Sequence, residues 1–185
     1  MSAFESPLHE LVAHAHGNAA RVAELLEAHP ELLEERYAAW NETPMEAAAH
    51  TGSRDVAELL MARGARPTHG ALAMLGRADD LRAALEAQPS LAHTPGAHGI
   101  SLLYHAALSG DPRVLEVAWG AGAREGLDHA VHASVLAGSA DALRWLLARG
   151  ARLDAPNAQG KTPLAVARAR GADELVAVLE ANRTA

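Results

Sequence analysis

A short apolar segment recurs along the chain, bounded by glycines at a fixed spacing. Gly52, Gly110 and Gly138 are followed by SRDVAELLMARGAR, DPRVLEVAWGAGAR and SADALRWLLARGAR, and a second glycine follows each of them at the same distance, at Gly64, Gly122 and Gly150. Weaker copies begin at Ala19, Ala78 and Ala172. The first apolar positions of the six copies are Val22, Val56, Leu81, Val114, Ala142 and Leu175, so three of the five steps are nearly equal and two are shorter. Such recurrence indicates a stack of repeated units that bury a continuous core against one another.

The composition favours short helices as the repeated elements. Alanine makes up about a quarter of the 185 residues, and aromatic residues make up only 3%. Alanine is depleted in strands and fills little space, so the elements must pack closely together. Glycine and proline interrupt the chain at short intervals, and we therefore expect no helix to run much beyond a dozen residues.

A second motif precedes each of these segments. It reads SPLHELVAHAHG near the start, and later TPMEAAAHTG, SLLYHAALSG, HAVHASVLAG and TPLAVARARG. On these motifs and on the length of its longer steps, the chain resembles the ankyrin repeat family, whose signature is T-P-L-H-x-A at a period of about 33 residues. Thr43-Pro44 and Thr162-Pro163 match the signature well, whereas the copy that begins at Thr68 lacks both the proline and the closing glycine.

The resemblance implies an all-α fold, an ankyrin-like helical repeat solenoid of stacked antiparallel helix pairs with shortened inter-repeat loops in places. We expect a single ankyrin-repeat domain over residues 1–185. Its approximate units are 6–40, 41–67, 68–98, 99–126, 127–158 and 159–185. Where the spacing is long, extended loops are expected at Glu34–Glu42, His93–Gly99 and Asp154–Gly160.

Local chemistry predicts how a unit is built. Thr43 can cap a helix whose first turn accepts Pro44, and Gly52 can supply the left-handed residue that ends it. The leucine pairs of the second helices should face the core, where each buried leucine contributes about 1.5–3 kcal/mol. These pairs are Leu59-Leu60 and Leu146-Leu147.

Several functional classes are excluded by the composition. The chain has no cysteine, which excludes a disulfide framework, a thiolate nucleophile and a cysteine-based zinc site. Its 16 Lys and Arg against 23 Asp and Glu, a net charge of −7, argue against a nucleic-acid partner. No apolar run approaches the ~18 residues of a membrane span, and the N-terminus lacks the positive region of a signal peptide. We therefore expect a cytoplasmic protein with no membrane partner. Scarce lysine and isoleucine beside abundant alanine, arginine and glycine indicate a bacterial source.

The sequence also lacks catalytic motifs. It contains no phosphate-binding glycine loop of the P-loop type, no HExxH and no GxSxG. Asp79 and Asp80 are adjacent carboxylates, but neighbours on a helix point apart. We predict a monomeric, non-enzymatic module without a cofactor.

The resemblance implies that function lies in a concave groove lined by the first helices and in the loop tips beside it. We expect this surface to bind an unidentified protein partner, and the net negative charge favours a partner with basic patches. The expected contact residues are Tyr37, Trp40, His50, Leu72, Leu75, His105, Leu108 and Leu136. An alternative is that the leucines fill gaps left by the short copies and that Trp40 packs against its own repeat.

Eleven histidines support a second hypothesis, small-molecule or metal binding by groove histidines such as His50 and His105. Asp128, His129 and His132 also have a spacing at which residues three apart share a helix face. No fourth ligand is evident near them, and we predict no bound metal.

The other histidines have simpler interpretations. His9 and His132 occupy the fourth position of the motif, where the resemblance implies a structural hydrogen-bonding role between units. His14 and His16 lie two residues apart, which places them on different helix faces.

Overall fold

The computed structural model describes residues 4–182, and this part of the chain is helical, with one isolated antiparallel bridge and no strand. Twelve α-helices alternate between two sets. The first set comprises α1 (Pro7–Ala15), α3 (Pro44–Thr51), α5 (His69–Met74), α7 (Leu102–Leu108), α9 (Leu127–Ala137) and α11 (Pro163–Ala169). The second set comprises α2 (Ala19–Ala28), α4 (Arg54–Ala62), α6 (Ala78–Ala87), α8 (Pro112–Gly120), α10 (Ala140–Leu147) and α12 (Asp173–Ala181). Three short 3-10 helices lie between them, η1 (Pro30–Leu32), η2 (Pro89–Ala92) and η3 (Ala97–Gly99). The all-α prediction is confirmed.

The helices begin and end as the local chemistry predicts. The side-chain oxygen of Thr43 accepts a hydrogen bond from the backbone N–H of Glu46, and the Glu46 carboxylate accepts one from the N–H of Thr43. This reciprocal capping box satisfies two backbone donors that the first turn of a helix leaves free. Gly52 closes α3 in the left-handed conformation, at φ +77°. In the copy at Thr68, Gly76 adopts φ +79° after α5, so our expectation that this unit has no closing glycine is wrong.

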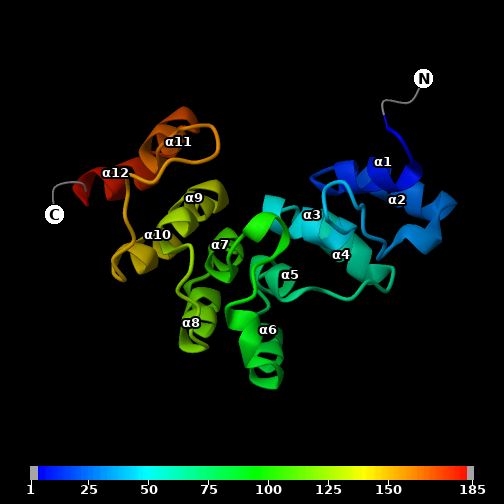
Figure 1. Cartoon of the computed structure of the whole chain (residues 1–185). Helices are drawn as coiled ribbons and strands as arrows, with labels where there is room; N and C mark the ends of the chain where they lie inside the picture. Colours follow the sequence, from blue (N-terminus) through cyan, green and yellow to red (C-terminus); the bar gives the residue numbers. More distant parts are fainter. Residues whose placement is uncertain (1–3, 183–185) are drawn as a thin grey trace.

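The helices pack in consecutive pairs, and the pairs follow one another in a row from α1–α2 to α11–α12 (Figure 1). Within the row, each helix of the first set contacts the next helix of that set. Neighbouring helices of the second set also pack closely, with the exception of α4 and α6. The core therefore runs continuously between the two sets instead of forming one central cluster.

The recurring apolar positions of the sequence are buried. The six positions that the sequence identifies as the first apolar residue of each second helix are at most 2% exposed: Val22, Val56, Leu81, Val114, Ala142 and Leu175. The leucine pairs are confirmed only in part. Leu60 and Leu146 are fully buried, whereas Leu59 and Leu147 are half-buried, because consecutive residues on a helix point about 100° apart and only one of two can face the core centrally.

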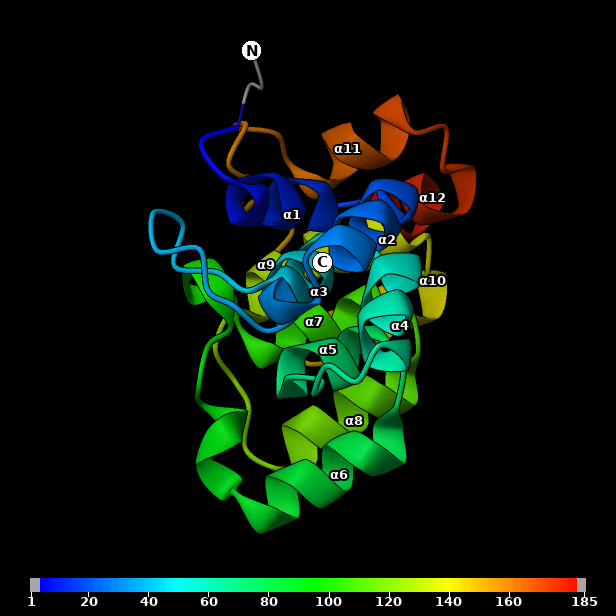
Figure 2. The same cartoon turned by 90° about the vertical axis from the view of Figure 1, so that its right-hand side faces the viewer.

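The three long loops share one backbone arrangement. A backbone N–H donates across each loop, from Tyr37 to Glu42 (2.9 Å), from Gly96 to Ile100 (2.8 Å) and from Asn157 to Lys161 (2.9 Å). Each loop leads directly into a helix of the first set. The loops before α3 and α7 lie on the same side of the row of helices (Figure 2). This arrangement places residues from two different units next to each other at the loop tips.

Among the residues that the structure describes, no helix combines the length and apolar character needed to cross a membrane.

The half-buried and fully buried leucines of α10 provide a matched test of the core. Leu146→Ala should lower the free energy of unfolding by about 2–5 kcal/mol, because it leaves a cavity among fully packed side chains. Leu147→Ala removes the same atoms from a partly solvated position and should cost less. Chemical denaturation of both variants measures the difference, and equal losses would contradict the burial pattern.

Candidate functional site

A groove of about 860 Å³ runs beside the ends of the first-set helices, from α3 to α11. Side chains and loop backbone from five of the expected units, 41–67 to 159–185, form its walls. The lining comprises His50, Thr51, His98, Gly99, Ile100, Ser101, Tyr104, Glu125, Gly126, His129, His132, Leu136, Asn157, Ala158, Gln159 and Val166. Glu125 is the one Asp, Glu, Lys or Arg residue among them, so the groove is mainly apolar and uncharged, with amide, hydroxyl and imidazole groups available for hydrogen bonding.

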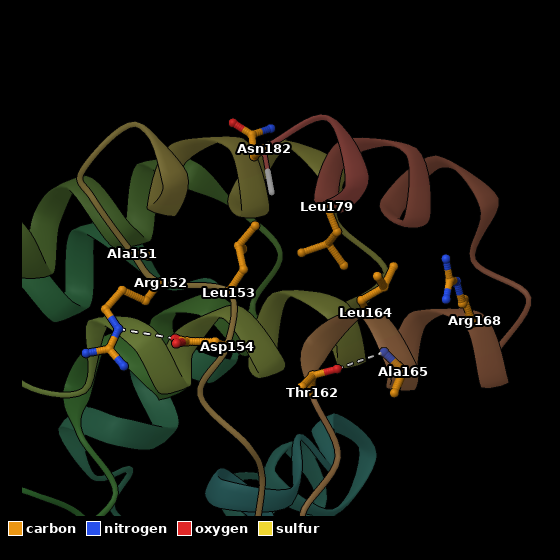
Figure 3. A pocket seen from close by; sticks show the side chains of 10 residues that line it. All are labelled: Ala151, Arg152, Leu153, Asp154, Thr162, Leu164, Ala165, Arg168, Leu179 and Asn182. Atoms are coloured by element: carbon orange, nitrogen blue, oxygen red, sulfur yellow. Dashed lines mark hydrogen bonds and ion pairs between the residues drawn. The ribbon is translucent and has the colours of Figure 1, made fainter. Parts of the chain in front are cut away.

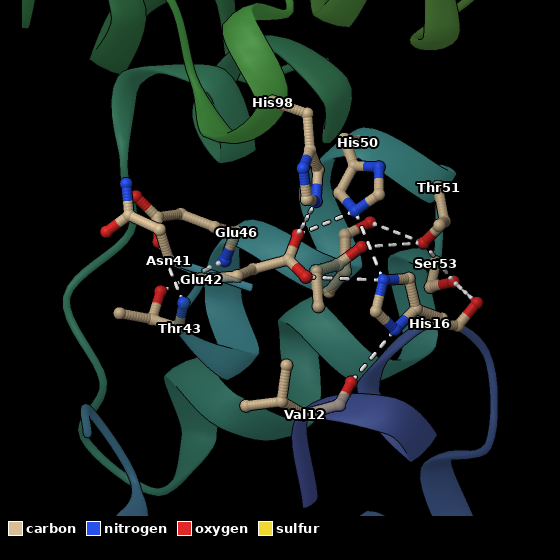
Figure 4. A network of polar contacts seen from close by, with 12 residues as sticks. Val12, His16, Asn41, Glu42, Thr43, Glu46, His50, Thr51, Ser53 and His98 are labelled. Atoms are coloured by element: carbon tan, nitrogen blue, oxygen red, sulfur yellow. Dashed lines mark hydrogen bonds and ion pairs between the residues drawn. The ribbon is translucent and has the colours of Figure 1, made fainter. Parts of the chain in front are cut away.

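His50 and His98, which line the groove near α3, contact a buried carboxylate that is not itself part of the lining (Figure 4). Glu42, the residue before the cap of α3, is 0% exposed. Its Oε1 lies 2.7 Å from Nε2 of His50 and 3.3 Å from Nε2 of His98, and its Oε2 lies 3.4 Å from Nε2 of His16. The Nε2 atoms of His16 and His50 are 3.2 Å apart. We call these four residues the His-Glu cluster.

Four segments position the His-Glu cluster. His16 follows the last residue of α1, His50 lies in the last turn of α3, and Glu42 and His98 lie in the loops before α3 and α7. The ring of His16 is held by its own helix, since its Nδ1 lies 2.9 Å from the carbonyl oxygen of Val12 and 3.2 Å from that of Ala13. Its ring is therefore fixed with Nε2 directed at Glu42.

The charges of the His-Glu cluster are coupled. Burial raises the pKa of the Glu42 carboxyl, but hydrogen bonds and positive charge from His16 and His50 outweigh burial and lower it to about 2. The hydrogen bond to Glu42 raises the pKa of His16, although burial opposes this. Glu42 is therefore a carboxylate, and its negative charge stabilises the protonated form of His16.

Two of the predicted contact residues lie in the groove. His50 and Leu136 both line it, and Leu136 is 41% exposed. Tyr37 and Trp40 lie outside the lining, near α1. The Tyr37 ring stacks on that of His9 with centroids 4.7 Å apart, and Trp40 packs edge-on against His9 at 5.0 Å. Trp40 nevertheless keeps 39% of its surface exposed.

The other four predicted contact residues are buried, so our expectation that they form an open surface is wrong. Leu72, Leu75 and Leu108 are 8%, 9% and 7% exposed, and His105 is 2% exposed. The first helices approach so closely through their alanines that larger side chains at these positions fill the space between neighbours. These four residues therefore do not form an exposed apolar surface in the described part of the chain.

His105 has a structural role. Its Nδ1–H donates to the carbonyl oxygen of Ser101 at 2.9 Å. Its ring occupies a slot beside Gly70 and Gly96, where an added Cβ would lie 3.2 Å and 2.9 Å from ring atoms. Burial lowers the pKa of His105 to about 4, with small further effects of His69 and His50. His105 is therefore neutral in the core and takes no part in the His-Glu cluster.

Asp128, His129 and His132 do not form a metal site. The Nε2 of His132 lies 2.8 Å from the carbonyl oxygen of Ala155, and the Asp128 carboxylate accepts a hydrogen bond from the backbone N–H of Arg152. His132 thus has a structural role, but it ties α9 to a loop of its own expected unit 127–158 and not, as predicted, to a different unit.

Sequence reasoning missed most of the His-Glu cluster. It selected His50 and noted His16 only as a neighbour of His14, and it selected neither Glu42 nor His98. One feature of the sequence could have drawn attention to Glu42. The residue before the helix cap is a glutamate in this loop, whereas the equivalent residues of the other two long loops are Ile100 and Lys161.

A second hollow lies at the C-terminal end of the row, between the loop after α10 and the helices α11 and α12 (Figure 3). It measures about 540 Å³. Its polar groups pair with each other: Arg152 with Asp154 at 3.2 Å, and the Thr162 hydroxyl with the N–H of Ala165. The groove is the better candidate site, because two of its lining histidines contact the buried carboxylate of Glu42.

A scan against protein-family models finds no match to the chain, and a search of curated proteins finds none either.

Two leucines near the ends of neighbouring helices test the corrected surface. Leu108→Asn should lower the free energy of unfolding by about 3–5 kcal/mol, because it leaves a cavity and buries an amide. Leu136→Asn should change it by no more than about 1 kcal/mol, since that side chain is already partly in water. Thermal or chemical denaturation measures both, and a well-folded Leu108→Asn variant would show that Leu108 faces solvent.

The buried neutral imidazole of His105 predicts a pH dependence. Its folded pKa of about 4 lies below its ordinary value of 6.5, so the unfolded chain takes up the proton first as the pH falls. Its contribution to stability is complete above pH ~6.5 and is lost progressively down to pH ~4, by up to about 3 kcal/mol. The difference in unfolding free energy between the wild type and His105→Gln should therefore shrink over this interval. A difference that is independent of pH would contradict the prediction.

Proposed function

We propose that the chain is a non-enzymatic recognition module of the ankyrin type, whose groove binds an extended segment of a partner protein. The observation that supports this proposal is the groove itself, which has a volume of about 860 Å³ and a mostly uncharged lining drawn from five successive units. Its size and its mixture of apolar and hydrogen-bonding groups suit an extended segment. The sequence repeats and the packing of consecutive helix pairs support the ankyrin-type assignment.

The chemistry of the groove supports binding over catalysis. Two of its three side-chain hydroxyl groups have structural tasks: Thr51 donates to the carbonyl oxygen of Ala47 at 2.8 Å, and Ser101 caps α7. Glu125 is exposed on the wall and can pair with a lysine or arginine of the partner. The overall charge of −7 should increase the association rate with a basic partner more than the affinity. We propose in addition that the module is monomeric and cytoplasmic, in keeping with its lack of cysteine.

A site-specific photo-crosslinker tests the groove proposal. Placed at Leu136 in the groove, it should form an adduct with one protein in native lysate, because this side chain is exposed beside the bound segment. The matched control carries the same group at Glu58, an exposed residue of α4. Glu125→Lys in the Leu136-labelled chain should reduce the yield of the adduct.

Identical adducts from positions 136 and 58 would contradict the groove proposal, since they would reflect general surface contact. The absence of any protein adduct from position 136 would contradict it as well.

A further inference from the structure

We propose that the His-Glu cluster is a binding site for a divalent transition metal of the zinc class. Three potential ligand atoms there lie within 4.8 Å of one another: the Nε2 atoms of His16 and His50 and a carboxylate oxygen of Glu42. His98 is the fourth ligand in this proposal, because its Nε2 lies 3.3 Å from the same carboxylate. Figure 4 shows the three rings directed at the carboxylate from three different segments. Nothing in the proposed recognition function requires this convergence.

The spacing of these atoms fits a tetrahedral site. A metal with ligands at about 2.0–2.1 Å separates them by about 3.3–3.4 Å along the edges of a tetrahedron. The cluster has edges of 3.2 Å between His16 and His50, 3.4 Å between His16 and Glu42, and 3.3 Å between His98 and Glu42. The edge between His50 and Glu42, at 2.7 Å, is a hydrogen-bond distance that would lengthen when metal replaces the proton. His16, His50 and Glu42 therefore need only small movements to bind one metal ion, and the His98 ring must move toward the two other imidazoles to complete the tetrahedron.

The orientation of His16 points to a cation at the centre. Its Nδ1–H donates to backbone carbonyl oxygens of α1, which in the neutral ring leaves Nε2 as a bare lone pair. That lone pair faces a carboxylate oxygen and a second imidazole nitrogen. The lone pair of His16 and the carboxylate repel one another unless a proton or a metal ion lies between them. A backbone carbonyl that orients the distal nitrogen is the usual second layer of a histidine metal site.

Glu42 is an independent observation that points to a ligand. Its carboxylate is fully buried, and apart from the three imidazoles neither oxygen has a hydrogen-bond partner among the described residues. Within residues 4–182, no arginine or lysine side chain forms an ion pair with it. Burying a carboxylate is costly unless it is paired or coordinates a metal.

The donor set selects the class of metal. Three imidazoles and one carboxylate suit Zn²⁺ and the neighbouring ions Co²⁺, Ni²⁺ and Cu²⁺, whereas Mg²⁺ and Ca²⁺ prefer oxygen ligands. Four protein ligands around a buried carboxylate make a closed site of the structural type. Metal bound there would join α1, α3 and the loop before α7, and would fix the wall of the groove that His50 and His98 form.

The test uses the tag-free full chain with ZnCl2 and CoCl2. We expect one equivalent of metal per chain in calorimetry, a higher thermal midpoint with zinc, and the visible absorption of tetrahedral Co²⁺. His98→Ala should weaken binding at least tenfold and leave the metal-free fold intact, because this side chain is about half exposed on a loop tip. The matched control is His93→Ala, on an exposed histidine of the same loop, which should bind metal like the wild type.

Metal binding by the Glu42→Gln variant is the second measurement. The substitution keeps a hydrogen bond to the imidazoles but removes the negative charge of the carboxylate. Loss of metal from Glu42→Gln and His98→Ala, with retention in His93→Ala, supports the site. Failure of Glu42→Gln to fold leaves the decision to the His98→Ala and His93→Ala pair. Binding below one tenth of an equivalent in the wild type, or equal affinity of wild type and His98→Ala, would overturn the proposal and identify the cluster as a hydrogen-bonded network held by protons.

Discussion

The close approach of the first-set helices is the constraint on which the rest of the structure depends. It is made possible by alanines that are buried to 0–1% in successive units, among them Ala47, Ala48, Ala49, Ala106, Ala107 and Ala133. A methyl group is the largest side chain that such close packing admits along most of the contact. The abundance of alanine and the scarcity of aromatic residues are therefore requirements of this packing, and each unit needs only a few leucines to complete the core.

The same close packing explains why the centre of the chain differs from an open recognition surface. Larger side chains at the ends of the first helices, such as Leu72 and Leu108, fill the space between neighbours. The ring of His105 is accommodated because Gly70 and Gly96 have no side chain to oppose it. The open surface consequently shifts to the loops before the helices, and the groove is formed where these loops project.

Recurrence along the chain made most of the fold predictable. Each unit repeats one apolar position, one cap and one closing glycine, so six weak signals reinforce each other, and the six apolar positions are all buried. The functional surface lacks this reinforcement. His16, Glu42 and His98 occupy non-equivalent positions in three segments. Each therefore looks like an ordinary polar residue when the repeats are compared. Which of two adjacent leucines enters the core, as at Leu146 and Leu147, likewise depends on the rotation of the helix against its neighbour.

The sequence by itself determined the helical class, the repeating register, the caps that end the helices and the three long loops, because these follow from interactions between residues close in the chain. Only the tertiary structure decided which side chains are exposed and which polar groups meet. His98 and Glu42 belong to different units and lie far apart in the sequence. They meet because two loops before different helices project on the same side of the row. The stacking of whole units determines the distances between side chains of different units, and these distances cannot be predicted from a local pattern of residues.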